Sequence, residues 1–211
     1  MTVKTFIFNP VQENTYLVFD ETLEAVIIDA GCVFENEYRQ IDGFIEYNKL
    51  KIKHLLNTHL HFDHILGNKY IADKYGVLPE AHAGDELMIA SLESTLRSLG
   101  INLSVQGQPI GRYLTETDTV KFGNAQFKIL HVPGHSQGSL CFYNEKDGIL
   151  FSGDTLFRGT VGRTDLPAGD HNTLITNIQQ KLMLLPDRTV VYPGHGATTT
   201  IGEERKSNPY L

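Results

Sequence analysis

The sequence is poor in cysteine, has no excess of positive charge and contains no long apolar run. Its two cysteines, Cys32 and Cys141, form no CxxC motif and do not indicate a disulfide framework. The net charge of −7 argues against a nucleic-acid partner, because phosphate contacts need a basic face. No stretch is apolar for long enough to cross a membrane, and residues 1–10 lack the pattern of a signal peptide. We therefore expect a cytoplasmic protein with reduced thiols.

The length of 211 residues favours a single domain over residues 1–211. A chain of this size buries a large core without disulfides or a structural metal. Any metal ligands in it are therefore free to serve chemistry. The oligomeric state is not readable from the sequence.

Strand and helix patterns are mixed in both halves of the chain. Runs of β-branched and aromatic residues predict strands at residues 3–8, 15–19, 25–29, 52–57, 125–130, 140–143, 149–151 and 189–192. Apolar residues at helical spacing predict helices near residues 34–45 and at residues 65–75, 85–99 and 172–184. The mixture predicts an α/β fold in which two sheets pack face to face with helices outside.

Four candidate metal ligands stand close together after the strand predicted at residues 52–57. Alternate residues of an extended loop point the same way, so His59 and His61 can hold one cation. Asp63 and His64 lie where the chain turns into the next helix and can face a second cation. Imidazole suits zinc, iron or manganese, and the carboxylate adds a hard, negatively charged ligand.

Three more candidate ligands follow later strands. Pro-Gly-His comes directly after a strand twice, ending in His135 and His195, and Asp154 follows the strand at residues 149–151. Glycine permits unusual backbone angles, so each turn can direct its histidine off the strand end. Seven ligands suffice for two divalent ions. With two carboxylates and a bridging hydroxide, such a site keeps a net positive charge and favours deprotonated water at neutral pH.

The segment HLHFDH resembles the HxHxDH signature of the metallo-β-lactamase fold, and His135, Asp154 and His195 follow in that family's order. The resemblance covers nearly the whole chain and implies an αββα sandwich with the metals at one edge. It implies one metal held by His59, His61 and His135, a second held by Asp63, His64 and His195, and Asp154 shared between them.

Within that family the chain is similar to glyoxalase II, the hydroxyacylglutathione hydrolases, and specifically to a short bacterial branch without the C-terminal helical domain. The similar segments are residues 151–157, 162–165, 203–205 and 208–211. The resemblance implies a small-molecule thioester substrate such as S-lactoylglutathione, attacked by a hydroxide that bridges two divalent ions. Zinc is the first candidate, with iron or manganese as alternatives, and Asp63 and Asp154 are the expected catalytic carboxylates.

Two further residues have two interpretations each. The family places an early Asp near the metals, and Asp29 matches it as a residue that orients ligands. A strand-end turn residue is an equally good interpretation of Asp29. Arg163 is expected to pair with a substrate carboxylate, or else to form a structural salt bridge, for instance to Asp165.

A competing motif is GxSxG at residues 134–138, the nucleophile elbow. It would make Ser136 the nucleophile of a serine hydrolase, with Asp165 and His195 as partners. The pattern is short and arises often by chance, and the longer metal constellation already uses His135 and His195. We therefore prefer the metal interpretation.

The alternative from another enzyme class is a persulfide dioxygenase. That related branch shares the HxHxDH signature and holds a single iron with two histidines and one aspartate, here His59, His135 and Asp154. We prefer a hydrolase, because the sequence keeps all seven ligands. A non-enzymatic binding module is the third hypothesis. The remaining histidines are expected to be ordinary surface or core residues: His54, His82, His131 and His171.

Overall fold

A computed structural model describes residues 1–211 and contains two six-stranded sheets. The first sheet has the strand order β1-β2-β3-β4-β5-β6. Its strands are β1 (Thr2–Phe8), β2 (Glu13–Phe19), β3 (Glu24–Ile28), β4 (Lys51–Leu56), β5 (Pro79–Ala81) and β6 (Arg112–Tyr113). Strand β2 is antiparallel to both of its neighbours β1 and β3, whereas β3 to β6 run parallel.

The second sheet has the strand order β14-β13-β10-β9-β8-β7. Its strands are β7 (Thr119–Phe122), β8 (Ala125–His131), β9 (Leu140–Asn144), β10 (Ile149–Gly153), β13 (Val190–Pro193) and β14 (Thr199–Thr200). A small hairpin of β11 (Leu156–Phe157) and β12 (Thr160–Val161) follows β10. Because β8 and β10 are both antiparallel to β9, and β13 is parallel to β10, the strands β8, β10 and β13 end at the same edge.

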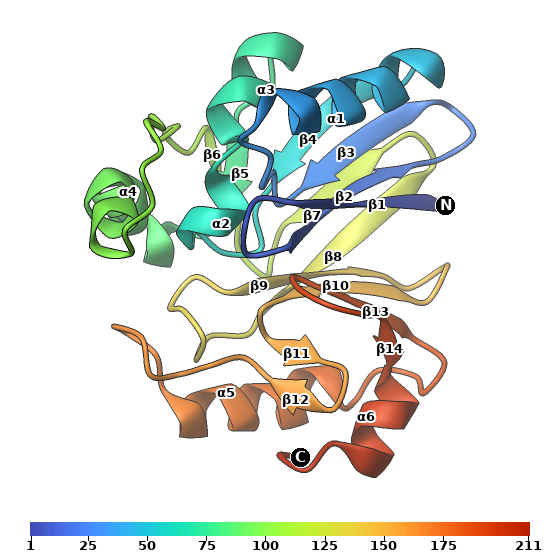
Figure 1. Cartoon of the computed structure of the whole chain (residues 1–211). Helices are drawn as coiled ribbons and strands as arrows, with labels where there is room; N and C mark the ends of the chain where they lie inside the picture. Colours follow the sequence, from blue (N-terminus) through green and yellow to red (C-terminus); the bar gives the residue numbers. More distant parts are fainter.

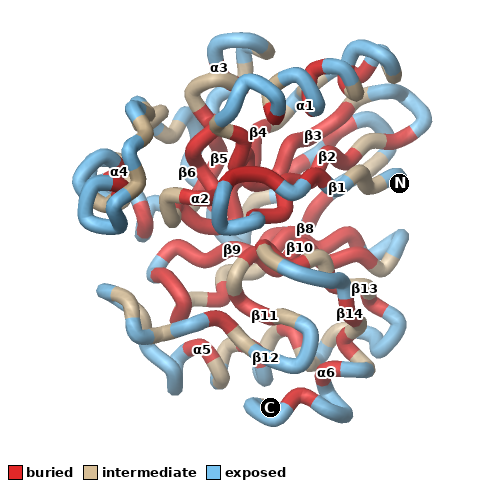
Figure 2. The backbone as a smooth tube through the Cα atoms, viewed as in Figure 1, coloured by how far each residue is buried: buried red, intermediate tan, exposed pale blue.

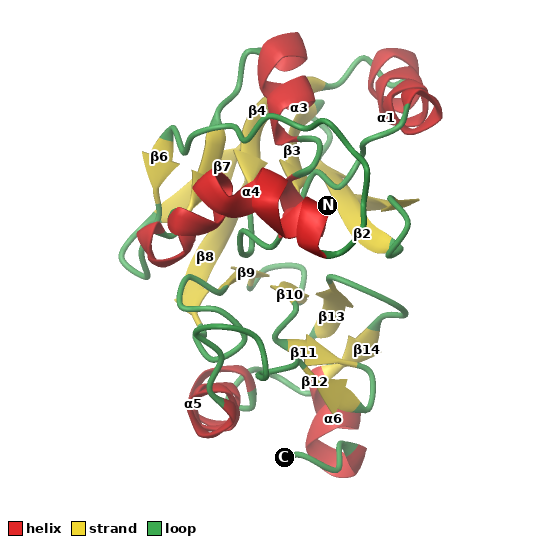
Figure 3. Ribbon diagram, turned by 60° about the vertical axis from the view of Figure 1, so that its left-hand side comes forward, coloured by secondary structure: helices red, strands yellow, loops and turns green.

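Helices cover the outer faces of both sheets (Figure 1). The α-helices are α1 (Glu35–Tyr47), α2 (Phe62–Ile65), α3 (Asn68–Tyr75), α4 (Leu87–Ser98), α5 (His171–Asn177) and α6 (Ile201–Ser207). Helices α1 and α3 lie on the first sheet, and α5 and α6 on the second. The turned view in Figure 3 shows the same layers, with α4 across the side of the first sheet. The predicted αββα sandwich is therefore confirmed.

The main core lies between the two sheets. Val26 and Leu56 of the first sheet pack there with Phe127, Phe142 and Phe151 of the second. Separate apolar clusters join α1 and α3 to the first sheet and α5 to the second, so the central strands are covered on both faces. Figure 2 shows this as buried strands beneath helices with exposed outer surfaces. Covering on both faces explains why these strands are almost continuously apolar in sequence.

The helix predicted at residues 65–75 is wrong in its extent, because two helices occupy this region. Helix α2 begins earlier, at Phe62, and α3 begins at Asn68. Between them the backbone amide of Gly67 donates a hydrogen bond of 2.7 Å to the carbonyl of Ala30. A Cβ at Gly67 would lie 2.4 Å from the Cys32 sulfur, so the break results from close packing against the loop after β3.

Several short elements have no counterpart in the sequence prediction. They are the strands β5, β6, β7, β11, β12 and β14 and the helix α6. Five of them are only two or three residues long, so apolar periodicity cannot reveal them. None of the helices is both long and apolar enough to span a bilayer.

Candidate metal centre

All seven predicted ligands lie at the edge where β4, β8, β10 and β13 end. Four come from the loop after β4 and from α2, and the other three follow β8, β10 and β13. The parallel direction of the last three strands brings their carboxyl ends together. Ligands that are far apart in sequence are therefore neighbours in the fold.

Three histidines form the first group of potential ligands. The Nε2 atom of His135 lies 3.2 Å from Nε2 of His59 and 2.8 Å from Nδ1 of His61. All three ligand atoms lie within 4.8 Å of one another. A tetrahedral zinc ion binds nitrogen at about 2.0–2.1 Å and so holds its ligands roughly 3.3 Å apart. The first group is close to that spacing.

Asp63, His64 and His195 form the second group, again with ligand atoms within 4.8 Å of one another. The Asp63 Oδ2 atom lies 3.1 Å from Nε2 of His195 and 3.5 Å from Nε2 of His64. This group contains a carboxylate of its own, which the first group lacks.

Asp154 lies between the two groups. Its Oδ1 atom is 3.5 Å from Nε2 of His64, and its Oδ2 atom is 3.8 Å from Nε2 of both His135 and His195. A Cβ at Gly194 would lie 2.1 Å from Asp154 Oδ1, so only glycine allows this approach. The position of Asp154 suits a carboxylate that bridges two cations.

Two of the histidines are oriented by backbone carbonyls. The Nδ1 atom of His135 donates to the carbonyl of Arg163 at 2.8 Å, and Nδ1 of His195 donates to the carbonyl of Gln12 at 3.2 Å. Each bond places the ring proton on Nδ1 and leaves the Nε2 lone pair facing the site.

Asp29 is a strand-end turn residue that lies beside a candidate ligand. Its φ of 54° is the left-handed turn conformation that Asp tolerates after a strand. Its carboxylate accepts hydrogen bonds from the amide and hydroxyl of Thr58, at 2.7 and 2.6 Å, and lies 3.0 Å from Nδ1 of His64. A strand-end residue therefore also contacts a candidate ligand.

The pKa values of the histidines in the site shift in opposite directions. Burial lowers the pKa of His59 well below its ordinary value, and burial reinforced by neighbouring histidines lowers the pKa of His61 to about 4. Burial also lowers the pKa of His64, but the carboxylates of Asp63 and Asp154 outweigh it and raise that pKa well above the ordinary value. These low pKa values favour the neutral form of His59 and His61, which is the form that binds a metal.

The residues present fit divalent metal ions. The buried atoms Nε2 of His64 and Oδ1 of Asp154 have no hydrogen-bond partner in the protein. Buried polar atoms are almost always partnered, so two unpartnered atoms 3.5 Å apart fit a cation bound by both. Imidazole and carboxylate ligands in this proportion suit zinc, iron and manganese.

Arg163 forms the structural salt bridge that was one of its two expected interactions. Its side chain is 61% exposed and forms a two-pronged ion pair with Asp165 at 2.7 and 2.8 Å. Exposed pairs of this kind are weak and easily exchanged. Contact of Arg163 with a substrate stays a prediction, whereas its backbone carbonyl already contacts His135.

The serine-hydrolase interpretation is wrong. The Ser136 hydroxyl is buried, donates to Asp85 at 2.7 Å and lies 2.8 Å from the Ser139 hydroxyl, with no histidine partner. The proposed partners are engaged elsewhere, since Asp165 pairs with Arg163 and His195 faces the metal ligands.

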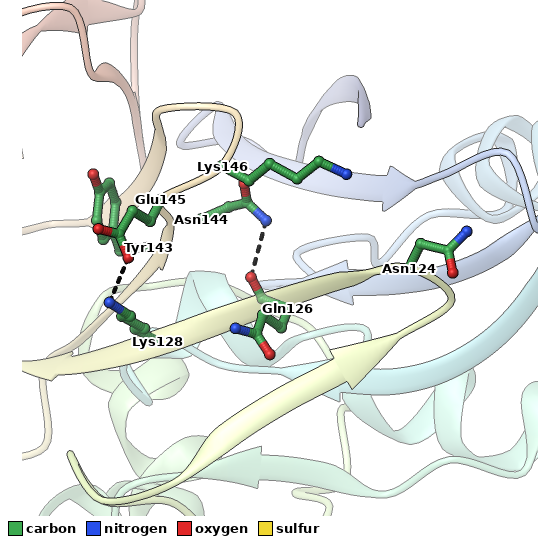
Figure 4. A pocket seen from close by; sticks show the side chains of 7 residues that line it. All are labelled: Asn124, Gln126, Lys128, Tyr143, Asn144, Glu145 and Lys146. Carbon is green, nitrogen blue, oxygen red and sulfur yellow. Dashed lines mark hydrogen bonds and ion pairs between the residues drawn. The ribbon is translucent and has the colours of Figure 1, made fainter.

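The other four histidines lie outside the two groups. His54 contacts Glu80, the rings of His82 and His131 stack at 4.2 Å, and His171 begins α5. A polar hollow of about 320 Å³ also lies elsewhere, beside the β7–β8 and β9–β10 turns at the end of the sheet opposite the ligands (Figure 4). Two of its side chains form the Lys128–Glu145 ion pair.

Backbone partners of the ligands were missed by the sequence analysis. The carbonyls of Arg163 and Gln12 carry no side-chain signal that could reveal them. The glycines of the two Pro-Gly-His turns were detectable, and both are required. Gly134 has a φ of 137° and packs against the backbone of Leu174, whereas Gly194 makes room for Asp154.

Several known proteins match this chain over nearly its full length. The protein named hydroxyacylglutathione hydrolase GloC of Haemophilus influenzae is 36% identical over 95% of this chain and 93% of its own. Among solved structures, BLEG-1 B3 metallo-beta-lactamase has a TM-score of 0.90 at 34% identity and covers 100% of this chain and 99% of its own. TTHA1623 in a di-iron-bound form has a TM-score of 0.86 at 34% identity and covers 100% of both chains.

A more distant structure, ETHE1 from Myxococcus xanthus, has a TM-score of 0.78 at 28% identity and covers 99% of this chain and 84% of its own. The family model of the metallo-beta-lactamase superfamily matches residues 8–195. That range contains all seven candidate ligands. The chain therefore belongs to the metallo-beta-lactamase superfamily of metal-binding hydrolases.

Proposed function

We propose that this chain, as a single domain of residues 1–211, is a hydrolase that holds two divalent metal ions. The observation that carries the proposal is the convergence of seven candidate ligands, two of which, His64 and Asp154, have buried atoms without a hydrogen-bond partner. The first ion would be held by His59, His61 and His135, the second by Asp63, His64 and His195, with Asp154 shared.

Two bound ions would supply a nucleophile derived from water and polarise the carbonyl of the substrate. The protein's own contribution is orientation and charge. Asp63 and Asp154 would balance part of the positive charge of the ions. Backbone carbonyls hold His135 and His195 in the tautomer that a metal needs.

The proposed substrate class is a small thioester such as S-lactoylglutathione. The similarity to a protein named hydroxyacylglutathione hydrolase over nearly the whole chain supports this class. A thiolate is a good leaving group, so the reaction needs little acid catalysis. We place the protein in the cytoplasm, with zinc as the first metal to test and iron or manganese next.

Persulfide dioxygenation is the second candidate function. It would use one iron at His59, His135 and Asp154. The Nε2 atom of His135 lies 3.2 Å from Nε2 of His59 and 3.8 Å from the Asp154 carboxylate, which permits such a triad. The likeness to ETHE1 supports keeping this alternative.

The test compares substrates and metals directly. Protein loaded with zinc, iron or manganese is assayed for hydrolysis of S-lactoylglutathione and a β-lactam, and for oxygen uptake with a persulfide. Thioester hydrolysis that chelators abolish is expected. In Asp154→Ala, turnover should fall on the order of a thousandfold, because metal charge stabilisation is worth several kcal/mol. The control Asp73→Ala removes an exposed acid that pairs only with Lys69. Near-normal turnover in Asp154→Ala would sink the proposal.

A further inference from the structure

Asp85 is a buried carboxylate that joins two ligand loops. It lies at the end of the 3-10 turn Ala83–Asp85, between β5 and α4, and is 2% exposed. Its Oδ2 atom accepts from the amide of Leu60 at 3.3 Å and from the hydroxyl of Ser136 at 2.7 Å. Its Oδ1 atom accepts from the amide of Gly138 at 2.7 Å.

The three donors are neighbours of candidate ligands in sequence. Leu60 stands between His59 and His61, and Ser136 directly follows His135. The carboxylate of Asp85 therefore ties the loop after β4 to the loop after β8 through backbone groups. The whole first group of ligands is attached to this one side chain.

The loop after β8 packs closely against Asp85 and the 3-10 turn that contains it. A Cβ at Gly138 would lie 2.7 Å from Asp85 Cγ, and a Cβ at Gly84 would lie 3.0 Å from the Gln137 carbonyl carbon. The Ser and second Gly of the GxSxG motif thus both serve this contact. The motif that suggested a nucleophile elbow therefore has a structural explanation, because its serine hydroxyl and its second glycine amide both donate to Asp85.

The charge of Asp85 has no cationic side chain to balance it, because none of the ion pairs in the protein includes it. Burying an anion is costly unless it is paired or hydrogen-bonded. The first ligand group consists of three histidines and has a carboxylate only through Asp154, whereas the second group contains Asp63 and contacts Asp29. A cation among the three histidines would complement the negative charge of Asp85.

We propose that Asp85 is a positioning residue for the metal bound by His59, His61 and His135. The inference rests on the metal ligands of the proposed function. A carboxylate offers acceptors only, so it satisfies all three donors at once. An amide in its place would turn an N–H group toward at least one of them, and the loops would separate.

The test is a zinc titration of the metal-free protein in competition with a chromophoric chelator. Outer partners of metal ligands typically contribute about 10–100-fold in affinity. Asp85→Asn should weaken one of two zinc sites by about that factor, and its thioesterase activity should recover at saturating zinc. Ser136→Ala, which removes one donor of three, should weaken the same site less. If Asp85→Asn does not fold, Ser136→Ala still tests the proposal, because it is the milder change.

The matched control is Asp42→Asn. Asp42 is 8% exposed and accepts hydrogen bonds from the hydroxyls of Tyr70 and Tyr75, far from the ligand loops. It should lower stability and leave both zinc affinities unchanged. A second readout is hydrogen exchange in the metal-free protein, where the amides of Leu60 and Gly138 should exchange faster in Asp85→Asn than in wild type.

The outcomes separate the two proposals. Wild-type protein that binds two zinc ions, with both affinities unchanged in Asp85→Asn, would overturn the role of Asp85 and leave the metal centre intact. Wild-type protein that binds neither zinc, iron nor manganese would overturn the proposed function and, with it, the metal role of Asp85. Weakening of both sites equally in Asp42→Asn and Asp85→Asn would reduce Asp85 to a purely structural residue.

Discussion

Several histidines of this centre use both ring nitrogens, one facing the other candidate ligands and one contacting a residue outside them. His64 turns Nε2 toward Asp63 and Asp154, and its Nδ1 lies 3.0 Å from Asp29. His135 does the same with the carbonyl of Arg163. The sequence revealed the ligands, because imidazole and carboxylate groups at close spacing are a visible pattern. It could not reveal the carbonyl that orients His135, because every residue has one.

Ser136→Ala separates a positioning hydroxyl from a nucleophile. Loss of one buried hydrogen bond should cost about 1 kcal/mol of stability, and turnover at saturating metal should stay within about tenfold of wild type. Steady-state kinetics and urea unfolding measure the two effects. A variant with full metal content and no turnover would restore the serine-hydrolase interpretation.

Among the elements, the strands that carry the ligands were predicted best. Strand β10 is buried along its whole length and reads as an apolar run, whereas β4 and β8 alternate exposed polar residues with more buried apolar ones. The break between α2 and α3 was not predicted, because it depends on how closely Gly67 approaches Cys32 in the folded chain. Short strands such as β5 and β6 exist only through their pairing with a neighbour. Their sequences alone contain too few residues for a pattern.

A pair of glycine substitutions tests the helix break. Gly67→Ala should destabilise the protein by about 1–3 kcal/mol, because its Cβ would lie 2.4 Å from the Cys32 sulfur. Gly43→Ala, inside α1 with nothing within 4 Å of its Cβ, should stabilise it by about 0.5–1 kcal/mol. Urea denaturation measures both free energies of unfolding. Equal effects of the two substitutions would refute the packing explanation.

The contact of His54 between the two sheets predicts a pH-dependent stability. Its Nδ1 atom lies 2.5 Å from Glu80 and its Nε2 atom 3.0 Å from the carbonyl of Lys121 in β7. Both partners are acceptors, so only the protonated ring satisfies both. Burial lowers the pKa of His54, but the hydrogen bond and charge of Glu80 outweigh it and raise the pKa above 6.5.

A raised native pKa means that the contribution of His54 is complete below the unfolded pKa and disappears as the pH rises through the native one. The difference in unfolding free energy between wild type and His54→Gln should therefore be larger at pH 6 than at pH 9. Urea unfolding at the two pH values, in the presence of chelator, measures it. The same difference at both pH values would show that the charge of His54 contributes nothing.

In the whole molecule, both sheets contribute candidate ligands to the same edge of the sandwich. The first sheet contributes the HxHxDH loop after β4, and the second contributes single residues after β8, β10 and β13. The sandwich was predictable from the mixture of elements and from the family resemblance. The packing that unites the two ligand loops at Asp85 was not, because it joins positions that are far apart in sequence.

The most direct test of the dinuclear centre is the metal content per chain. Elemental analysis is applied to protein purified without chelator and with zinc, iron and manganese supplied. We predict about two ions per chain, since seven ligands in two groups suffice for two sites. A single iron per chain that resists added metal would contradict the dinuclear hydrolase, and oxygen uptake with persulfides would then be the activity to measure.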